Sequence, residues 1–340
     1  MRIKKNEGTD SFKAQLKDII ADNKSFVITV HAHSDGDAIG AEFALYLFLK
    51  KLGKDVRILN QDPPSSKYDF LALSSKVEIP HNGFQASLPS HYILFMLDYN
   101  EKKRVGKKMQ EVFEHYKQIV CIDHHQVTKD TIKAVSYIDT SASSVCEILY
   151  LLLKEDILDF SSHAKEKIAT CLYSGLIYDT NNFSNKNVSV KTFAVASDLL
   201  ALGVDNNLCY LNIFDKKSTK ALKLLGMTLS TLELYELENK MKIALYSTTR
   251  EMLEECETGM ELTEDFSNEV KPTSEREVVI YIRQADTNYF RVSLRSLSLD
   301  VEKIAEGFGG GGHKLAAGFE TKMELEMLKN KLFELINKGG

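Results

Sequence analysis

The sequence predicts an α/β protein: an N-terminal, doubly wound, mostly parallel sheet joined by a helical linker to a smaller α/β C-terminal domain. Short apolar segments alternate with helix-like segments in the first half of the 340-residue chain, as in a parallel sheet with helices on both faces. A largely helical stretch follows, and strand-like segments then return. The expected boundaries are 1–205 for the first domain, 206–240 for the linker and 241–340 for the second domain.

The elements of the first domain are predicted from hydrophobic patterning. Short runs rich in apolar and β-branched residues predict strands at 25–31, 55–60, 91–98, 118–125 and 134–139. Apolar residues at helical spacing predict helices at 38–53, 143–155, 163–178 and 191–203. The segment LSTLELYELENK, residues 229–240, is expected to form a connecting helix.

The C-terminal domain is predicted to combine a small sheet with two helices. The segments KIALYSTT, REVVIYIRQ and YFRVSLRS are strand-like, and the last two are expected to form a hairpin around ADTN. A helix near VEKIAEGF precedes the run GGGG, and EMLKNKLFELIN is expected to form the final helix.

Composition excludes several classes of function. A formal net charge of −5 and a pI near 6.0 disfavour tight binding along long nucleic acid, which depends on neutralising phosphates. The five cysteines form no CxxC pair, which argues against a disulfide framework or a structural zinc site. Apolar stretches such as LYLLL are too short to span a bilayer. A cytoplasmic protein without a membrane partner is therefore expected.

Side chains that can bind metal ions follow several predicted strands at the point where each strand ends. They are His31 with Asp35 and Asp37, then Asp98, and finally Asp123 with His124 and His125. Ligand sites in parallel sheets form outside the carboxyl ends of the strands. Any one of these residues alone reads as a helix cap, a turn residue or a structural histidine. Carboxylates gathered at one edge would take up protons unless cations balance them, so their shared location indicates divalent metal ions.

Asp179 adds an independent indication of metal binding. It ends a predicted helix, where a carboxylate faces the negative end of the helix dipole at a cost of about 0.3–1 kcal/mol. A nearby dication would offset that cost, whereas the alternative is a solvated turn residue in Asp-Thr-Asn-Asn. A set of Asp and His ligands without thiolate suits Mn²⁺ or Mg²⁺, and the imidazoles favour Mn²⁺. Two such ions could share a carboxylate, activate water and hold a phosphate. Because neighbouring side chains on a strand alternate, His124 and His125 are expected to face different directions.

The segment GFGGGGHKLAAGF, residues 307–319, is the second motif of interest. Glycines let backbone N–H groups approach an anion closely, and His313 and Lys314 add donors beside them. Arg295, in VSLRS, can grip a phosphate with its planar guanidinium. We expect an anion-binding element here, with a flexible linker as the alternative.

These motifs resemble those of a known family. HAHSDGDAIG, FMLDYN, CIDHH and YDT match, in this order, the four motifs of the DHH phosphoesterase family, and VSLRS with DVEKIAEGFGGGGHKLAAG looks like its DHH-associated C-terminal domain. Within the family the chain most resembles the bifunctional oligoribonucleases and pAp phosphatases. Three departures stand out: Ala41 replaces a common Ser, NNF after Asp179 replaces a common pair of glycines before Phe, and the segment 248–276 matches the family pattern poorly.

The resemblance implies roles for individual residues. His31 and Asp35 would hold one Mn²⁺, Asp37, His124 and Asp179 a second, and Asp98 would bridge the two ions, with Mg²⁺ as the alternative metal. His125 and Asp123 would be catalytic, His125 facing the substrate and Asp123 orienting the imidazoles. Arg295, Ser296, Gly310, Gly311, Gly312 and His313 would bind the substrate.

The function implied is hydrolysis of short RNA or DNA oligonucleotides to mononucleotides, and of pAp to AMP and phosphate. The alternatives are a manganese pyrophosphatase or polyphosphatase, a RecJ-type single-strand exonuclease and a non-catalytic nucleotide-sensing module. The sequence is compatible with a monomer and with a homodimer.

Overall fold

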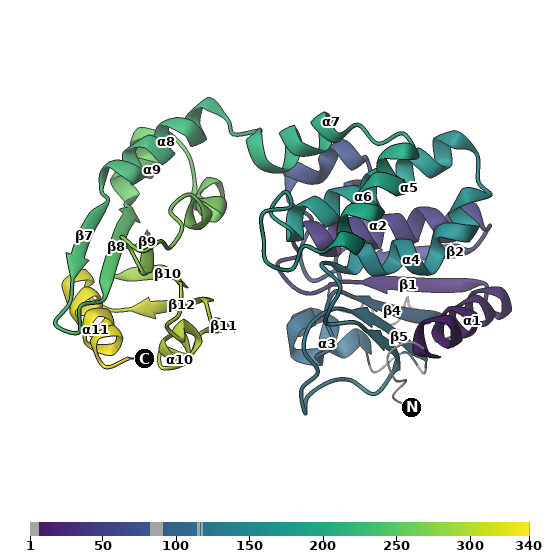
Figure 1. The fold of residues 1–340 in the computed structure, drawn as a ribbon, viewed down its shortest axis with the longest axis horizontal. Coiled ribbons are helices and arrows are strands. Elements are labelled where there is room, and N and C mark those ends of the chain that lie inside the picture. The colour runs from purple at the N-terminus through teal and green to yellow at the C-terminus, as the bar shows by residue number, and fades with distance from the viewer. Residues whose placement is uncertain (1–6, 82–90, 114–115, 117, 340) are drawn as a thin grey trace. The chain divides into compact units, whose positions relative to one another are not determined.

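The computed structural model divides into two compact units, Met1–Lys216 and Lys217–Gly340, whose elements are labelled in Figure 1. It describes residues 7–81, 91–113, 116 and 118–339. Each unit contains one six-stranded sheet with helices packed on it, which confirms the predicted α/β class. The segment expected as a linker, 206–240, is shared between the units: 206–216 fold with the first and 217–240 with the second.

The sheet of the first unit is parallel throughout and lies in the order β3-β2-β1-β4-β5-β6. Its strands are β1 (Ser25–Thr29), β2 (Asp55–Leu59), β3 (Val77–Glu78), β4 (Ile93–Leu97), β5 (Ile119–Asp123) and β6 (Val135–Ile138). The order reverses between β1 and β4, and open α/β sheets form their ligand crevices at such a point, outside the carboxyl ends of the strands.

Helices cover both faces of this sheet (Figure 1). They are α1 (Glu7–Asp22), α2 (Gly36–Lys51), α3 (Lys107–Phe113), α4 (Val145–Leu158), α5 (Ser162–Asp179), α6 (Val190–Ala201) and α7 (Asn206–Tyr210). Helices α2, α4 and α5 share one core with the sheet, and α3 packs on the opposite face. Within the described parts of the chain, every helix falls short of the length or hydropathy needed to cross a bilayer.

Two glycines allow α2 and α5 to approach closely. A Cβ on Gly40 would lie 2.5 Å from the carbonyl oxygen of Cys171, and a Cβ on Gly175 would lie 2.3 Å from the Sγ of Cys146 and 3.0 Å from the Cα of Asp37. Any larger residue would force the helices apart. This close packing brings the C-terminus of α5 to the N-terminus of α2.

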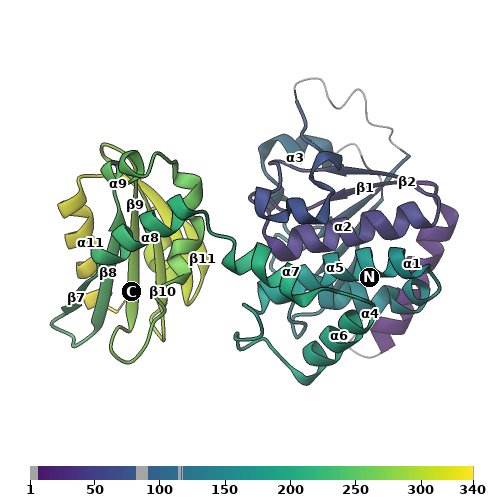
Figure 2. The same ribbon diagram turned by 90° about the horizontal axis from the view of Figure 1, so that it is seen from above.

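The second unit has a mixed sheet in the order β11-β12-β10-β9-β8-β7. Its strands are β7 (Glu233–Glu236), β8 (Lys242–Thr248), β9 (Val278–Asp286), β10 (Tyr289–Ser296), β11 (Gly311–His313) and β12 (Ala316–Lys322), and its helices are α8 (Thr219–Ser230), α9 (Arg250–Glu255), α10 (Val301–Glu306) and α11 (Leu325–Asn337). The β9–β10 hairpin confirms the prediction around ADTN. Helices α10 and α11 pack on one face of the sheet, and α8 and α9 on the other (Figure 2).

The prediction of a connecting helix over 229–240 is wrong. Helix α8 ends at Ser230, and Glu233–Glu236 forms β7, which pairs antiparallel with β8. Tyr235 and Leu237 both pack against the core of the second unit. Their spacing of two residues is that of a strand, and it outweighs the helix propensity of the intervening Leu and Glu residues.

Candidate metal centre

The predicted ligands of the first unit meet at one edge of the parallel sheet. His31 follows β1, Asp98 follows β4, and Asp123 is the last residue of β5. Because β1 and β4 are neighbours at the reversal of strand order, His31 and Asp98 lie side by side there. Asp179, the last residue of α5, joins them from the helical layer.

Asp98 lies at the centre of the group. Its Oδ2 is 3.5 Å from the Nε2 of His31, and its Oδ1 is 3.4 Å from the Nε2 of His124. The side chain is 2 % exposed, and Oδ1 accepts no hydrogen bond from the described residues. The backbone of Asp98 has φ of +66°, an uncommon conformation for a residue other than glycine that is found at functional sites. A buried oxygen left without a donor fits a cation as its partner.

Two trios of potential ligands share this region of the structure. One consists of His31, Asp35 and Asp98, and the other of Asp37, His124 and Asp179; in each, the ligand atoms lie within 4.8 Å of one another. In the second trio, the Nε2 of His124 lies 4.0 Å from the Oδ2 of Asp37 and 3.6 Å from the Oδ2 of Asp179. A third grouping, Asp98 with His124 and His125, overlaps both. The donor set is oxygen and imidazole nitrogen, which suits Mn²⁺ or Mg²⁺.

The two trio histidines are held in the same way. The Nδ1 of His31 lies 2.9 Å from the carbonyl oxygen of Ala32, and the Nδ1 of His124 lies 3.4 Å from that of Ala142. When Nδ1 carries the proton and donates to the carbonyl, the lone pair is on Nε2, which faces the carboxylates. Metal-binding histidines show this arrangement.

The acidic residues at the start of α2 have structural partners as well. Asp35 is the N-cap, and its Oδ1 accepts from the backbone N–H groups of Asp37 and Ala38. Asp37 accepts from the N–H groups of Val145 at 2.5 Å and Cys146 at 2.9 Å, in the first turn of α4. The capping role considered for Asp35 therefore exists, and it orients the same carboxylate toward His31.

Asp123 orients His125. The Oδ1 of Asp123 is 2.8 Å from the Nδ1 of His125 and accepts from the N–H groups of His124 and His125, while Oδ2 accepts from Asn100. The two histidines were expected to face different directions because side chains alternate along a strand. That reason does not hold, because β5 ends at Asp123 and neither histidine lies on the strand. Their rings lie 4.7 Å apart, and each presents a nitrogen to Asp98, at 3.4 Å from His124 and 3.6 Å from His125. Only their other partners differ.

The carboxylates of this cluster raise the pKa values of their neighbours, as expected where too few positive charges balance them. Burial lowers the pKa of His31 but is outweighed by Asp98, which raises it to about 9. Burial likewise opposes the charge of His124, yet Asp98, Asp37 and Asp179 raise its pKa to about 10. Burial and the charge of Asp98 raise the pKa of Asp37 to about 7. Burial and the charge of Asp37 raise that of Asp179 to about 8. The protons held here occupy positions that dications would fill.

The turn after Asp179 explains one departure from the family motifs. Asn181, Asn182 and Phe183 have φ values of +46°, +51° and +62°. Glycine adopts this left-handed conformation without strain, and Asn is the non-glycine residue that tolerates it best. Thr180 stabilises the turn, since its Oγ1 accepts from the N–H of Phe183 at 3.1 Å.

In the second unit, Arg295 lies on β10. Its Nη2 is 3.4 Å from the Oδ1 of Asn268 and 3.5 Å from the Oγ of Ser267. Ser296 is buried, and its Oγ accepts from the N–H groups of Ser298 and Leu299. The hydroxyl of Ser296 thus shapes the turn after β10.

The glycine run has a structural part. Gly310 donates its N–H to the carbonyl of Ala305, and a Cβ there would lie 2.3 Å from the carbonyl oxygen of Gly318. Gly312 has φ of +150°, and a Cβ added there would lie 2.6 Å from the Cα of Ala317. Both therefore serve the close packing of this run on β12. Gly311 has open space beside it, and His313 is exposed at the end of β11.

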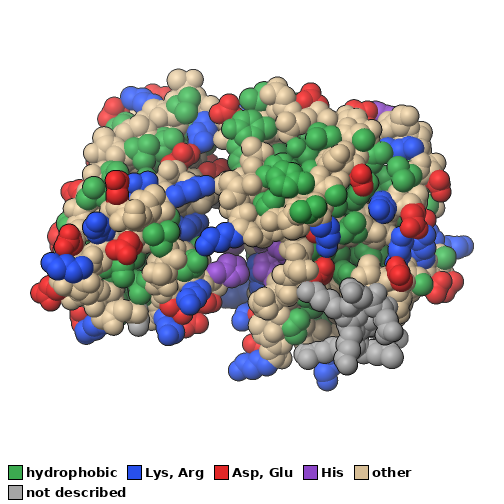
Figure 3. Space-filling model, viewed as in Figure 1, with side chains coloured by type: hydrophobic (Ala, Val, Ile, Leu, Met, Phe, Trp, Pro, Cys, Tyr) green, Lys and Arg blue, Asp and Glu red, His purple; other side chains and the backbone are tan. Residues whose placement is uncertain are grey.

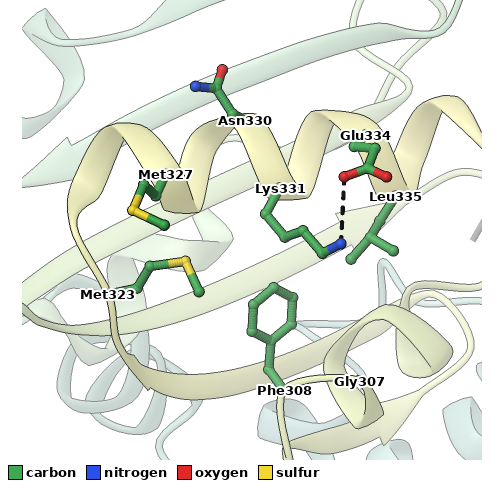
Figure 4. Close-up of a pocket in the computed structure, with 8 residues that line it drawn as sticks. All are labelled: Gly307, Phe308, Met323, Met327, Asn330, Lys331, Glu334 and Leu335. Atoms are coloured by element: carbon green, nitrogen blue, oxygen red, sulfur yellow. Dashed lines mark hydrogen bonds and ion pairs between the residues drawn. The ribbon is translucent and has the colours of Figure 1, made fainter.

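A pocket of about 600 Å³ lies along α11, between that helix and Phe308 (Figure 4). Met323, Met327 and Leu335 line it with Phe308, and Lys331 pairs with Glu334 at its side. Phe308 and Leu335 pack against the core on the α10–α11 face of the sheet. Arg295 points to the opposite face, because it alternates with the core residue Leu294.

Asn100 and Asn187 support the centre and were missed from the sequence. Asn100 donates to Asp123 at 2.6 Å, and Asn187 donates to the carbonyl oxygens of Ser143 at 2.9 Å and Asp179 at 3.4 Å. Asn100 could have been found from its place in FMLDYN, two residues after Asp98. Asn187 carried no such signal, because it lies outside the four motifs, in the turn that follows YDT.

The model of the DHH family N-terminal domain matches residues 25–176, and the DHHA1 domain model matches residues 257–338. This chain therefore contains a DHH domain followed by a DHHA1 domain. The DHH domain holds both trios except Asp179, three residues past the matched range, and the DHHA1 domain holds Arg295 and the glycine run. Members of the family are metal-dependent phosphoesterases, and the two trios are groups able to hold metal.

Two curated relatives extend the DHH and DHHA1 match to nearly the whole chain. A probable bifunctional oligoribonuclease and PAP phosphatase, NrnA, of Streptococcus mutans is 27% identical, covering 89% of this chain and 92% of its own. The bifunctional oligoribonuclease and PAP phosphatase NrnA of Thermus thermophilus is 28% identical, covering 92% and 89%. The crystal structure of an exopolyphosphatase-related protein from Bacteroides fragilis has the same fold, with a TM-score of 0.87 at 24% identity over 97% of each chain.

Proposed function

We propose that this DHH protein is a phosphoesterase that hydrolyses short oligonucleotides to mononucleotides and pAp to AMP and phosphate, with two divalent cations, preferably Mn²⁺. One observation carries the proposal: Asp98 directs one oxygen to His31, at 3.5 Å, and the other to His124, at 3.4 Å. A carboxylate between two imidazoles, each with further carboxylates beside it, fits the bridge of a two-cation site. The names of the relatives above support the choice of substrates.

The residues of the chain divide the work of hydrolysis. The cations, when bound, would supply Lewis acidity toward the phosphate and lower the pKa of water. His31, Asp35 and Asp98 would hold one cation, and Asp37, His124 and Asp179 the other, with Asp98 shared. This assignment uses the two trios as they stand in the structure.

His125 would serve the substrate. Its Nδ1 is fixed by Asp123 at 2.8 Å, which sets the ring orientation. An imidazole held in this way can donate a proton to a leaving oxygen or bind a phosphate oxygen. Asp123 would act through His125, as the orienting member of the pair.

Arg295 and His313 of the DHHA1 domain would bind the anionic part of the nucleotide. Arg295 is half-buried, and its contacts with Asn268 and Ser267, at 3.4 and 3.5 Å, are long. A phosphate could replace them with shorter, charge-assisted hydrogen bonds. Ser296, Gly310 and Gly312 would contribute by shaping the backbone around that site, and Gly311 by leaving room beside it.

The distribution of charged side chains on the surface favours a small substrate. On the face seen in Figure 3, basic and acidic side chains are interspersed over both units, and the formal net charge is −5. Long nucleic acids are bound through many phosphate contacts, whereas a nucleotide or a short oligonucleotide needs few cationic partners.

Product analysis tests the proposal. Purified protein with Mn²⁺ is offered pAp, pApA, a five-nucleotide RNA, pyrophosphate and polyphosphate in parallel. We expect AMP or other mononucleotides from the first three, loss of turnover after chelation, and loss of turnover in Asp98→Ala. Asp130→Asn, an exposed carboxylate outside the site, is the matched control and should keep full activity. Phosphate from pyrophosphate or polyphosphate alone would contradict the proposal, as would absence of any turnover.

A further inference from the structure

Glu147 is a buried carboxylate outside both metal-binding trios. It lies in the first turn of α4, and its side chain is fully buried. Its Oε2 accepts hydrogen bonds from the Oγ of Ser143 at 2.7 Å and the Oγ1 of Thr192 at 2.8 Å, and its Oε1 lies 3.0 Å from the Nζ of Lys191. Burying a carboxylate is costly unless it is paired and hydrogen-bonded; here Oε2 accepts two hydrogen bonds, and Oε1 accepts none within the described residues but forms the ion pair with Lys191. The question is what this set of contacts holds in place.

The segment next to Glu147, residues 142–146, contacts two members of the second trio. The carbonyl oxygen of Ala142 lies 3.4 Å from the Nδ1 of His124. The N–H groups of Val145 and Cys146 donate to the two carboxylate oxygens of Asp37. The position of this segment therefore sets the direction of the His124 ring and of the Asp37 carboxylate.

The same segment is linked to the third member of that trio. Asn187 donates to the carbonyl oxygens of Ser143, at 2.9 Å, and of Asp179, at 3.4 Å. Ser143 is thus held twice, by Glu147 through its hydroxyl and by Asn187 through its carbonyl. All three residues of the second trio connect to residues 142–146.

The first trio is held in a different way. His31 is oriented by the carbonyl of Ala32, its own neighbour, and Asp35 by the first N–H groups of α2. These contacts are made by neighbouring residues, and no residue of α4 takes part in them. A displacement of residues 142–146 would therefore affect the two trios unequally.

We propose that Glu147 is a positioning residue for the second trio: by holding Ser143, it fixes residues 142–146 and with them His124, Asp37 and Asp179. The inference rests on the proposed two-cation function, since it concerns the affinity of one of the two ions. Lys191 takes part by balancing the charge of the buried carboxylate. Glu147 contacts neither ion and acts only through the segment it holds.

The test is a titration of metal-free protein with Mn²⁺, followed by calorimetry. Glu147→Gln and Ser143→Ala each remove part of the contact, and Glu155→Gln on the same helix α4 is the matched control, because its side chain is 62% exposed. We expect wild-type protein and Glu155→Gln to bind two ions alike. In Glu147→Gln and Ser143→Ala, one of the two ions, assigned to the second trio, should bind about 10–100-fold less tightly than in wild-type protein, as for other groups that orient metal ligands. The other ion should be unaffected, and excess Mn²⁺ should restore kcat.

The outcomes separate this inference from the function on which it rests. Thermal unfolding in chelator reports whether each variant is folded, and Ser143→Ala, which loses a single hydroxyl, carries the test if Glu147→Gln does not fold. Equal weakening of both ions, or binding like that of wild-type protein, overturns the positioning role alone. Fewer than two ions in wild-type protein overturns the proposed function as well.

Discussion

Asp98 and the two imidazoles beside it set the chemistry at the scale of single residues. Although burial disfavours its charge, the nearby imidazoles of His124 and His31 hold the pKa of Asp98 well below its usual range. The same contacts raise the pKa values of His31 and His124 to about 9 and about 10. In the metal-free protein the centre therefore carries protons near neutral pH, and a metal ion must displace them.

This competition predicts the pH dependence of metal binding. Below its raised pKa each imidazole holds a proton, and Asp37 and Asp179 take up further protons as the pH falls through about 7 and about 8. Metal affinity is thus highest at high pH and falls as the pH falls. With at least one proton displaced per ion, the Mn²⁺ association constant should rise about tenfold or more per unit between pH 6 and 8. Calorimetry in buffers of different ionisation enthalpy measures the protons released, and a pH-independent constant without proton release would refute this explanation.

The two neighbouring histidines should respond differently to substitution. His124→Ala removes a trio member and should abolish binding of one ion. His125→Ala should leave two ions bound and lower kcat by about 10²–10⁴, the usual contribution of an acid–base group. Metal content and kcat measured on the same samples separate the two effects. Loss of an ion in His125→Ala would show that His125 is a ligand rather than a proton donor.

At the scale of elements, the approach of α5 to α2 and α4 places Asp179. Gly175→Ala would bring a methyl group to within 2.3 Å of the Sγ of Cys146 and 3.0 Å of the Cα of Asp37. We expect this overpacking to lower the free energy of unfolding by about 1–3 kcal/mol and to weaken the second trio. Gly226→Ala, in α8 with open space around it, is the matched control. It should raise the free energy of unfolding by about 0.5–1 kcal/mol. Denaturant unfolding of both variants measures these changes, and a Gly175→Ala variant as stable as wild-type protein would contradict the prediction.

The elements also show what a sequence can and cannot reveal. Strand ends predicted the positions of His31, Asp98 and Asp123, because parallel strands bring their carboxyl ends to one edge. The mutual approach of Asp179 and His124 depends on the packing of α5 against α2 and α4, which no local pattern encodes. Strand β7 was missed because Tyr235, within the strand, and Leu237, just after it, are too few core-facing residues to reveal a period of two.

At the scale of the whole molecule, the proposed function assigns the chemistry to the first unit and substrate recognition to the second. Four motifs far apart in the sequence predicted the trio residues of the first unit, since they bear ionisable groups at strand and helix ends. The supporting residues Asn100, Asn187 and Glu147 are ordinary polar residues by sequence, and only their hydrogen bonds to the centre distinguish them. In the second unit, the sequence could not separate glycines that pack closely, such as Gly310, from those beside open space, such as Gly311.

The central claim is that two metal ions share the carboxylate of Asp98, and electron paramagnetic resonance of Mn²⁺-loaded protein tests it most directly. We predict two Mn²⁺ ions per chain with the spectrum of a spin-coupled pair, and loss of the coupling in Asp98→Asn. Two uncoupled ions, a single ion, or coupling that survives in Asp98→Asn would contradict the claim.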